Sequence, residues 1–141
     1  MMQVKVCDYL SDDSKMIREK VFMEEQGFEN EFDDTDEIAT QIVMYDEDKP
    51  VATCRIFNGA SKEEFIFGRL AVLKEYRGRN IGTKVIQEAE KLVLEKGGKS
   101  MALHAQCRVK GFYEAMGYRA FGEVEDDEGC PHIWMKKALQ E

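Results

Sequence analysis

Hydrophobic and polar positions along the chain predict a series of short β-strands. Alternating or short apolar segments bounded by polar residues are typical of strands, and they occur at residues 3–8, 40–46, 51–58, 64–73, 100–105, 118–124 and 132–137. Residues 64–73 are apolar on both faces near their end, as expected of a central strand. The polar turn 47–50 indicates that the second and third strands form a hairpin.

Helical spacing of apolar residues predicts three helices between these strands. The first is capped by Ser11 or Asp12, runs to about residue 26 and ends at Gly27. The second has the clearest pattern, because its apolar residues fall on one face: Ile81, Val85, Ile86, Ala89, Leu92 and Val93. The third helix is predicted at residues 109–116. Residues 28–37 and 125–129 are acidic and are predicted to be irregular loops.

The order of these elements predicts an α/β fold with a mixed sheet and helices on both faces. No repeat, low-complexity tract or linker interrupts the chain. A chain of 141 residues is also close to the commonest domain size. We therefore predict a single domain over residues 1–141.

The composition excludes several classes of protein. The net charge is −8 and no basic stripe is present, which argues against a nucleic-acid partner. No apolar run reaches the roughly 20 residues of a membrane span, and the start lacks the apolar segment of a signal peptide, so a cytoplasmic location is expected. None of the four cysteines lies in a Cys-x-x-Cys pair, and no metal site is predicted. The acidic charge serves solubility or, alternatively, attracts a cationic amine.

A basic turn between the strand at 64–73 and the second helix is a candidate anion site. Gly78 and Gly82 let the backbone approach a ligand closely, and Asn80 tolerates a left-handed conformation. The N–H groups at the helix start, together with Arg77 and Arg79, suit a pyrophosphate. The alternative is a basic turn that only caps the helix. The dinucleotide and P-loop fingerprints are absent.

Four segments resemble the GNAT superfamily of N-acetyltransferases. Arg77-Gly78-Arg79-Asn80-Ile81-Gly82 is similar to its motif A, [Q/R]-x-x-G-x-[G/A], with Asn80 in place of the usual glycine. Gly111 to Tyr118 is similar to the family's Phe/Leu-Tyr-x-x-x-Gly-Phe/Tyr helix, and Gln106 takes the place of an Asn-like residue before it. Residues 18–27 and 129–135 look like the R-x-x-V-F-x-x-E-Q-G start and G-x-P-H-x-x-M ending of the ElaA-like branch.

The resemblance implies the GNAT acyl-CoA N-acyltransferase fold, whose sheet is mostly antiparallel and splays after the fourth strand. It also implies transfer of an acetyl group from acetyl-CoA to a primary amine of a small molecule by direct attack. Tyr113 matches the tyrosine that protonates the leaving thiolate. By the same resemblance the coenzyme would be held by Leu70, Ala71, Val72, Arg77, Gly78, Arg79, Asn80, Ile81, Gly82, Thr83 and Gln106.

The amine side of the site is expected where the first helix meets the last strand. The candidates for binding the amine there are Arg18, Phe22, Glu25 and His132. Glu25 and His132 are alternative general bases, and burial of Glu25 would favour that role because desolvation raises a carboxyl pKa. A protein or peptide N-acetyltransferase and a non-catalytic CoA-binding regulatory domain are the alternative functions. A homodimer is compatible with the sequence.

Overall fold

Seven β-strands hydrogen-bond in the order β1-β2-β3-β4-β5-β7-β6 in a computed structural model that describes residues 2–139. Strand β4 pairs with β5 in parallel, whereas β1–β2, β2–β3, β5–β7 and β6–β7 are antiparallel pairs. The predicted mixed, mostly antiparallel sheet is therefore confirmed. The strands are β1 (Met2–Cys7), β2 (Thr40–Asp46), β3 (Lys49–Asn58), β4 (Glu64–Val72), β5 (Ser100–Gln106), β6 (Arg119–Asp127) and β7 (Cys130–Ala138).

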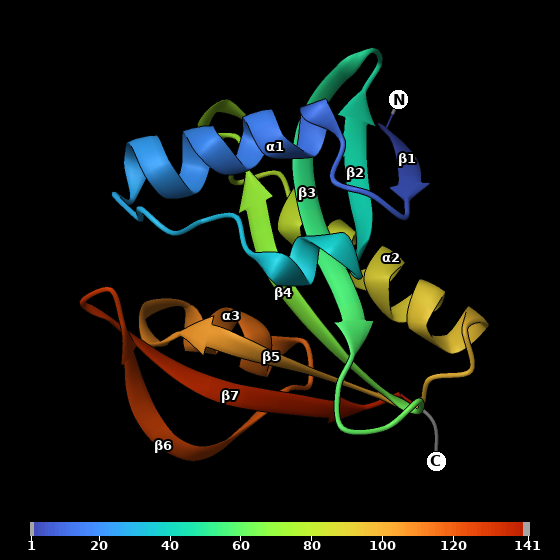
Figure 1. The fold of residues 1–141 in the computed structure, drawn as a ribbon, viewed down its shortest axis with the longest axis vertical. Coiled ribbons are helices and arrows are strands. Elements are labelled where there is room, and N and C mark those ends of the chain that lie inside the picture. Colours follow the sequence, from blue (N-terminus) through green and yellow to red (C-terminus); the bar gives the residue numbers. More distant parts are fainter. Residues whose placement is uncertain (1, 140–141) are drawn as a thin grey trace. The chain divides into compact units, whose positions relative to one another are not determined.

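Helices connect these strands in both of the compact units that the chain forms (Figure 1). The first unit comprises residues up to 57 and 68–89, and the second comprises residues 58–67 and 90 onward, so that β4 and α2 each contribute to both. One domain spanning residues 1–141 stays a prediction. The helical segments are α1 (Asp12–Arg18), the π-helix η1 (Glu19–Glu25), α2 (Ile81–Glu95), α3 (Lys110–Ala115) and the 3₁₀ turns η2 (Asp34–Glu37), η3 (Lys74–Tyr76) and η4 (Cys107–Val109).

In the first unit, α1 crosses the face of β2 and β3 (Figure 1). The Ser11 side chain caps α1 by accepting a hydrogen bond from the Ser14 N–H at 3.2 Å, as predicted. Gly27 has φ +77° and ends the helical stretch, as predicted. An apolar cluster beneath the helix joins it to the strands through Ile17, Val21, Phe22, Val43, Ala71 and Leu73. This packing fixes α1 and η1 against the unit's strands.

In the second unit, β5 lies between β4 and β7. The parallel register pairs Glu64–Phe67 of β4 with Ser100–Leu103 of β5, and β4 continues beyond this register to Val72. Gly98 precedes β5 at a crowded point, where an added Cβ would lie 2.8 Å from Phe65 and 2.4 Å from Val93. Glycine is therefore needed for the close approach of this turn to the apolar side chains.

Three predicted boundaries are corrected by the structure. The first helix is not a continuous α-helix, because its second half, Glu19–Glu25, is π-helical. The hairpin turn is shorter than predicted, because β3 begins at Lys49. The predicted acidic loop 125–129 is mostly strand: β6 runs to Asp127, β7 begins at Cys130, and Glu125 pairs with His132. Pairing with a neighbouring strand overrides the low β-propensity of acidic residues.

Candidate active site

The loop between β4 and α2 has the conformation that its sequence predicts. Leu73 donates its N–H to the Val51 carbonyl at 2.9 Å, which ties the end of β4 to β3. Gly78 has φ +80° and Asn80 has φ +60°, so both residues are left-handed, and α2 begins directly afterwards at Ile81. An α-helix leaves its first N–H groups without an intrahelical acceptor. An exposed, glycine-containing turn therefore leads into a helix N-terminus, a backbone arrangement that favours negative charge.

Arg77, at the start of this loop, holds Glu25 at the end of η1. Its Nε donates to the Val72 carbonyl at 3.0 Å, and its two terminal nitrogens each donate to a Glu25 carboxylate oxygen at 2.9 Å. About a third of the Glu25 side chain is exposed, so the structure does not provide the burial that would favour Glu25 as a base. The ion pair fixes the carboxylate next to the end of β4.

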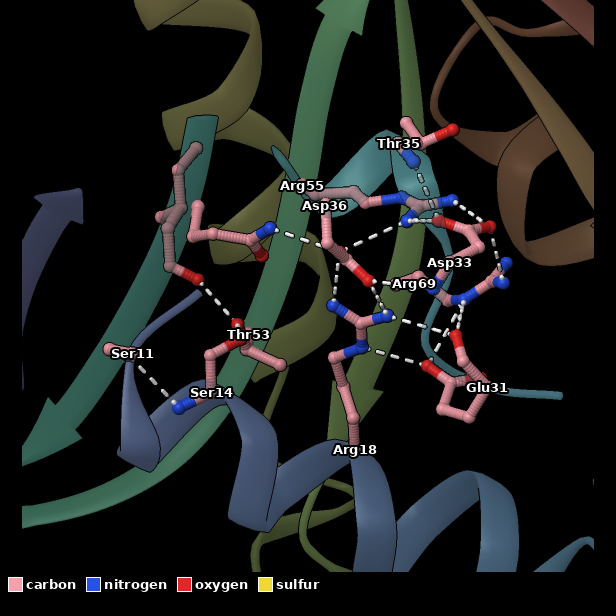
Figure 2. Close-up of polar contacts among 12 residues, drawn as sticks. Ser11, Ser14, Arg18, Glu31, Asp33, Thr35, Asp36, Thr53, Arg55 and Arg69 are labelled. Carbon is pink, nitrogen blue, oxygen red and sulfur yellow. Dashed lines mark hydrogen bonds and ion pairs between the residues drawn. The ribbon is translucent and has the colours of Figure 1, made fainter. Parts of the chain in front are cut away.

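Arg18 is fully buried and belongs to a larger group that we term the arginine–carboxylate network. Each of its three guanidinium nitrogens donates within the first unit, Nε to Glu31 at 2.7 Å, Nη1 to Asp36 at 2.7 Å and Nη2 to the Glu31 carbonyl at 3.1 Å. Figure 2 shows Arg18 on α1, with Arg55 on β3 and Arg69 on β4 converging on the same segment. The network consists of Arg18, Arg55, Arg69, Glu31, Asp33 and Asp36.

Three arginines and three carboxylates balance in charge within this network. Burial opposes ionisation of Asp36, but hydrogen bonds and charges from Arg18 and Arg55 outweigh it and hold the pKa of Asp36 well below its usual range. A hydrogen bond from Arg55 likewise lowers the pKa of Asp33. Burial raises the pKa of Glu31, against the opposing charge of Arg69. The network thus fastens the acidic segment 31–36 to α1, β3 and β4.

In the second unit, Tyr113 lies on α3 among other aromatic rings. It is 8% exposed, with its ring centroid 6.1 Å from that of Tyr118 and 5.1 Å from that of Phe112, both edge-to-face. Edge-to-face contacts hold the ring in one orientation. Packing therefore holds the Tyr113 ring on the short helix α3, which follows β5 and the turn η4.

His132 is a buried imidazole on β7 whose tautomer is set by its hydrogen bond. Its Nδ1 lies 2.8 Å from the Cys130 carbonyl oxygen, which can only accept, so Nδ1 carries the proton in the neutral ring and Nε2 carries the lone pair. The His104 ring is 5.0 Å away and stacks on Trp134. Burial, and next the neighbouring His132, lower the pKa of His104. His132 therefore has the lone pair that a base needs.

The predicted site residues divide between the two units. In the first unit, the structure brings Glu25 to Arg77 and Val72. In the second unit, Gln106 and His132 are directly opposite on β5 and β7. The meeting of the first helix with the last strand stays a prediction. Phe22 packs in the apolar cluster, and Arg18 holds the acidic segment 31–36 through the network. Contact of either residue with an amine also stays a prediction.

Sequence reasoning missed the rest of the arginine–carboxylate network to which Arg18 belongs. Arg55 and Arg69 lie inside strands, and Glu31 and Asp36 lie in a segment that was predicted only to be acidic and irregular. The available signal was a charged residue within a strand that is otherwise apolar on both faces, because a buried charge requires a partner. Spacing along the chain could not indicate which carboxylates that partner would be.

Within residues 2–139, no group of three or more histidine, cysteine or acidic side chains is arranged to hold a metal ion. Over the same range, no helix is long and apolar enough to cross a membrane.

Comparison with known proteins gives consistent likenesses over nearly the whole chain. The Acetyltransferase (GNAT) domain family matches residues 9–139. The uncharacterized N-acetyltransferase YjcF of Bacillus subtilis (strain 168) is 35% identical over 130 residues, covering 89% of this chain and 90% of YjcF. The crystal structure of Escherichia coli ElaA matches with a TM-score of 0.86 at 25% identity, covering 97% of this chain and 99% of ElaA. This likeness supports the predicted ElaA-like branch.

A more distant likeness shows the fold alone. An aminoglycoside 6′-N-acetyltransferase complexed with coenzyme A has a TM-score of 0.77 at 17% identity, and the match covers 99% of this chain and 98% of that one. The predicted GNAT acyl-CoA N-acyltransferase fold is confirmed by these structures together.

Proposed function

Because this chain belongs to the GNAT acetyltransferase family, we propose that it transfers the acetyl group of acetyl-CoA to a primary amine of a small molecule. The family membership makes it an acyl-CoA-dependent acetyltransferase. The identity of the acyl donor, the class of acceptor and the roles of single residues are our proposal. These assignments follow from the side chains and backbone groups that each of the two units contains.

The observation that carries the proposal is the conformation of the loop 77–83. Gly78 and Asn80 are both left-handed, and no atom lies within 4 Å of a Cβ built on Gly78, so a diphosphate has room to approach the backbone. The N-terminus of the 15-residue helix α2 and the exposed Arg79 favour a negative charge there. These residues fit the diphosphate of coenzyme A. The coenzyme complex of the aminoglycoside 6′-N-acetyltransferase, which has the same fold, is consistent with this proposal.

The remaining coenzyme contacts are assigned by the family pattern. Backbone amides of Leu70, Ala71 and Val72 would hold the pantetheine arm, and Gln106 would contact it from the end of β5. Arg77 is occupied by Glu25 and Val72 in this structure. We therefore assign Arg77 two roles: it places a positive charge near the diphosphate, and it anchors Glu25.

The chemical roles concern two proton movements. A thioester supplies an electrophilic carbonyl and a thiolate leaving group, and Tyr113 is the residue proposed to protonate that thiolate. His132 is the proposed base, because its lone pair is on Nε2. Glu25, which is held by two hydrogen bonds from Arg77, is better suited to binding the ammonium form of the amine than to removing its proton.

A screen of amines with a free-thiol readout tests the proposal. The purified chain is incubated with acetyl-CoA and with panels of small monoamines, polyamines, aminoglycosides and N-terminal peptides, and thiol release is followed. We expect thiol release that depends on a small amine and on the chain. Acetylation of the amine, measured by mass spectrometry, must account for the thiol that is released.

Each other outcome contradicts a definite part of the proposal. Thiol release with peptides alone would identify a protein or peptide N-acetyltransferase. Tight acetyl-CoA binding with no release for any amine would indicate a CoA-binding regulatory domain. Absence of acetyl-CoA binding in calorimetry would overturn the proposed coenzyme.

A further inference from the structure

Arg69 has an unusual backbone for its residue type and position. It lies within β4 and has φ +53°, in the left-handed region. The other non-glycine residues with positive φ in the described part of the chain, Glu47, Asn80 and Glu128, all lie in turns or directly before a helix. A left-handed arginine inside a strand is disfavoured by contact of its Cβ with the backbone. Something other than its own conformational preference therefore keeps it there.

The side chain of Arg69 provides that restraint. Its Nε lies 3.1 Å from both the Glu31 carbonyl oxygen and Glu31 Oε2, and its Nη2 lies 3.3 Å from Asp33 Oδ2. Glu31 is itself 4% exposed and is fixed by Arg18. Both ends of the Arg69 ion pairs are thus anchored in the first unit, and the guanidinium cannot move without breaking them.

The identity of the residue strengthens this argument. Glycine adopts a positive φ without penalty, and Gly68 is the preceding residue, yet position 69 carries an arginine. A backbone requirement alone would be met best by glycine. The arginine is therefore explained by what its guanidinium does.

The consequence of this conformation falls on the next three residues. The parallel register with β5 ends at Phe67, and a left-handed residue at 69 redirects the chain before Leu70, Ala71 and Val72. These are the residues whose amides would hold the pantetheine arm. The inference therefore rests on the proposed function.

We propose that Arg69 is a positioning residue: its ion pairs with Glu31 and Asp33 hold the left-handed turn in β4 that aims the backbone of Leu70–Val72 at acetyl-CoA. The acidic segment 31–36 then supports the coenzyme site through Arg69 and does not itself contact the coenzyme. Arg69 acts through the backbone and is not a catalytic residue.

The test compares Arg69→Ala with Arg69→Gly, which lose the same ion pairs. Alanine keeps the Cβ that disfavours positive φ, whereas glycine does not. We expect Arg69→Ala to weaken acetyl-CoA binding in calorimetry about tenfold, equivalent to roughly one hydrogen bond. Arg69→Gly should recover at least about threefold of that loss, because the turn is accessible without the side chain. The amine KM should stay unchanged in both variants.

The outcomes separate this inference from the proposed function. If the wild-type chain does not bind acetyl-CoA, both fall together. If it binds, and the alanine and glycine variants have equal affinities, whether intact or reduced, only the positioning role is overturned. Should Arg69→Ala fail to fold, Arg69→Asn and Arg69→Gln replace the pair, because asparagine tolerates the left-handed region and glutamine does not. The asparagine variant should then bind acetyl-CoA more tightly.

Discussion

Tyr113 and Tyr118 are two buried tyrosines of the second unit whose rings lie edge-to-face. The Tyr118 hydroxyl donates to Glu90 at 2.7 Å, and Glu90 also pairs with Lys137. The role of the Tyr118 hydroxyl is therefore structural. Tyr113 matches the family's tyrosine in the Phe/Leu-Tyr-x-x-x-Gly motif, and its proposed role is to protonate the leaving thiolate. The two residues therefore form a matched pair for separating structure from catalysis.

Tyr113→Phe should lower kcat about a hundredfold, because general-acid catalysis typically contributes this much. The ring and its contacts with Phe112 and Tyr118 are kept, so the melting temperature and the affinity for acetyl-CoA should change little. Steady-state kinetics with the acceptor found in the amine screen measure the effect. The control is Tyr118→Phe, which removes a buried hydroxyl from the same cluster and should leave kcat within about twofold of wild type. An unchanged kcat in Tyr113→Phe, with chemistry shown to be rate-limiting, would remove Tyr113 from the mechanism.

At the scale of elements, the turn from β4 into α2 combines two residues in the left-handed region with a helix N-terminus. Helix N-termini stabilise negative charge through their unpaired N–H groups and the macrodipole. An acidic side chain placed there is therefore favourable for the helix and unfavourable for a bound phosphate. An acidic substitution at position 82, in the first turn of α2, therefore separates an effect on helix stability from an effect on phosphate binding.

Gly82→Asp should abolish measurable acetyl-CoA binding, because its carboxylate occupies and repels the diphosphate site. The same change should keep or raise the melting temperature, since aspartate is favoured in the first turn of a helix. Gly82→Asn is the uncharged control of nearly equal size and should bind more tightly than Gly82→Asp. Calorimetry and thermal unfolding of both variants provide the measurements. Wild-type affinity in a folded Gly82→Asp variant would show that the diphosphate binds elsewhere.

At the scale of the whole molecule, the arginine–carboxylate network is a concentration of buried charge in an acidic protein. The chain has 28 acidic and 20 basic residues. Within the network, buried arginines hold Asp36 in its ionised form. Asp36 accepts from Arg18, Arg55 and Gln41. Its contribution to folding therefore depends on pH.

Asp36→Asn should lower the free energy of unfolding at pH 7 by about 3 kcal/mol, because removing one partner leaves buried arginine charge uncompensated. The folded pKa of Asp36 is depressed, so its stabilisation is present above its unfolded value of about 3.9 and is lost as the pH falls further. Glu31 has a raised pKa, so protonation of Glu31 on acidification favours the folded chain and opposes this loss. Wild type should therefore lose stability more steeply below about pH 4 than Asp36→Asn.

Urea unfolding at several pH values measures this difference. The control is Glu75→Gln, which removes an exposed ion pair with Lys49 and should leave the free energy of unfolding nearly unchanged. Parallel stability curves for wild type and Asp36→Asn down to pH 2 would contradict the assignment of acid sensitivity to Asp36.

The sequence by itself determined the features that have local causes. The Ser11 cap, the end at Gly27 and the left-handed Asn80 each depend on one residue's conformational or hydrogen-bonding preference. The period of the apolar residues in 81–95 determined α2 in the same way. The conformation of the loop 77–83 could therefore be predicted nearly residue by residue, and the motif in it was one of those that indicated the family.

Only the tertiary structure decided the features that depend on distant partners. The strands β6 and β7 extend through acidic residues because Glu125 pairs with His132, and Gln106 comes opposite His132 through the pairing of β5 with β7. The carboxylates that pair with the arginines of the network lie 13 to 38 residues away from them in the chain. A buried charge must be paired, but its local sequence does not specify with which group. Folding brings the groups together, and the left-handed Arg69 is held by contacts that no local pattern encodes.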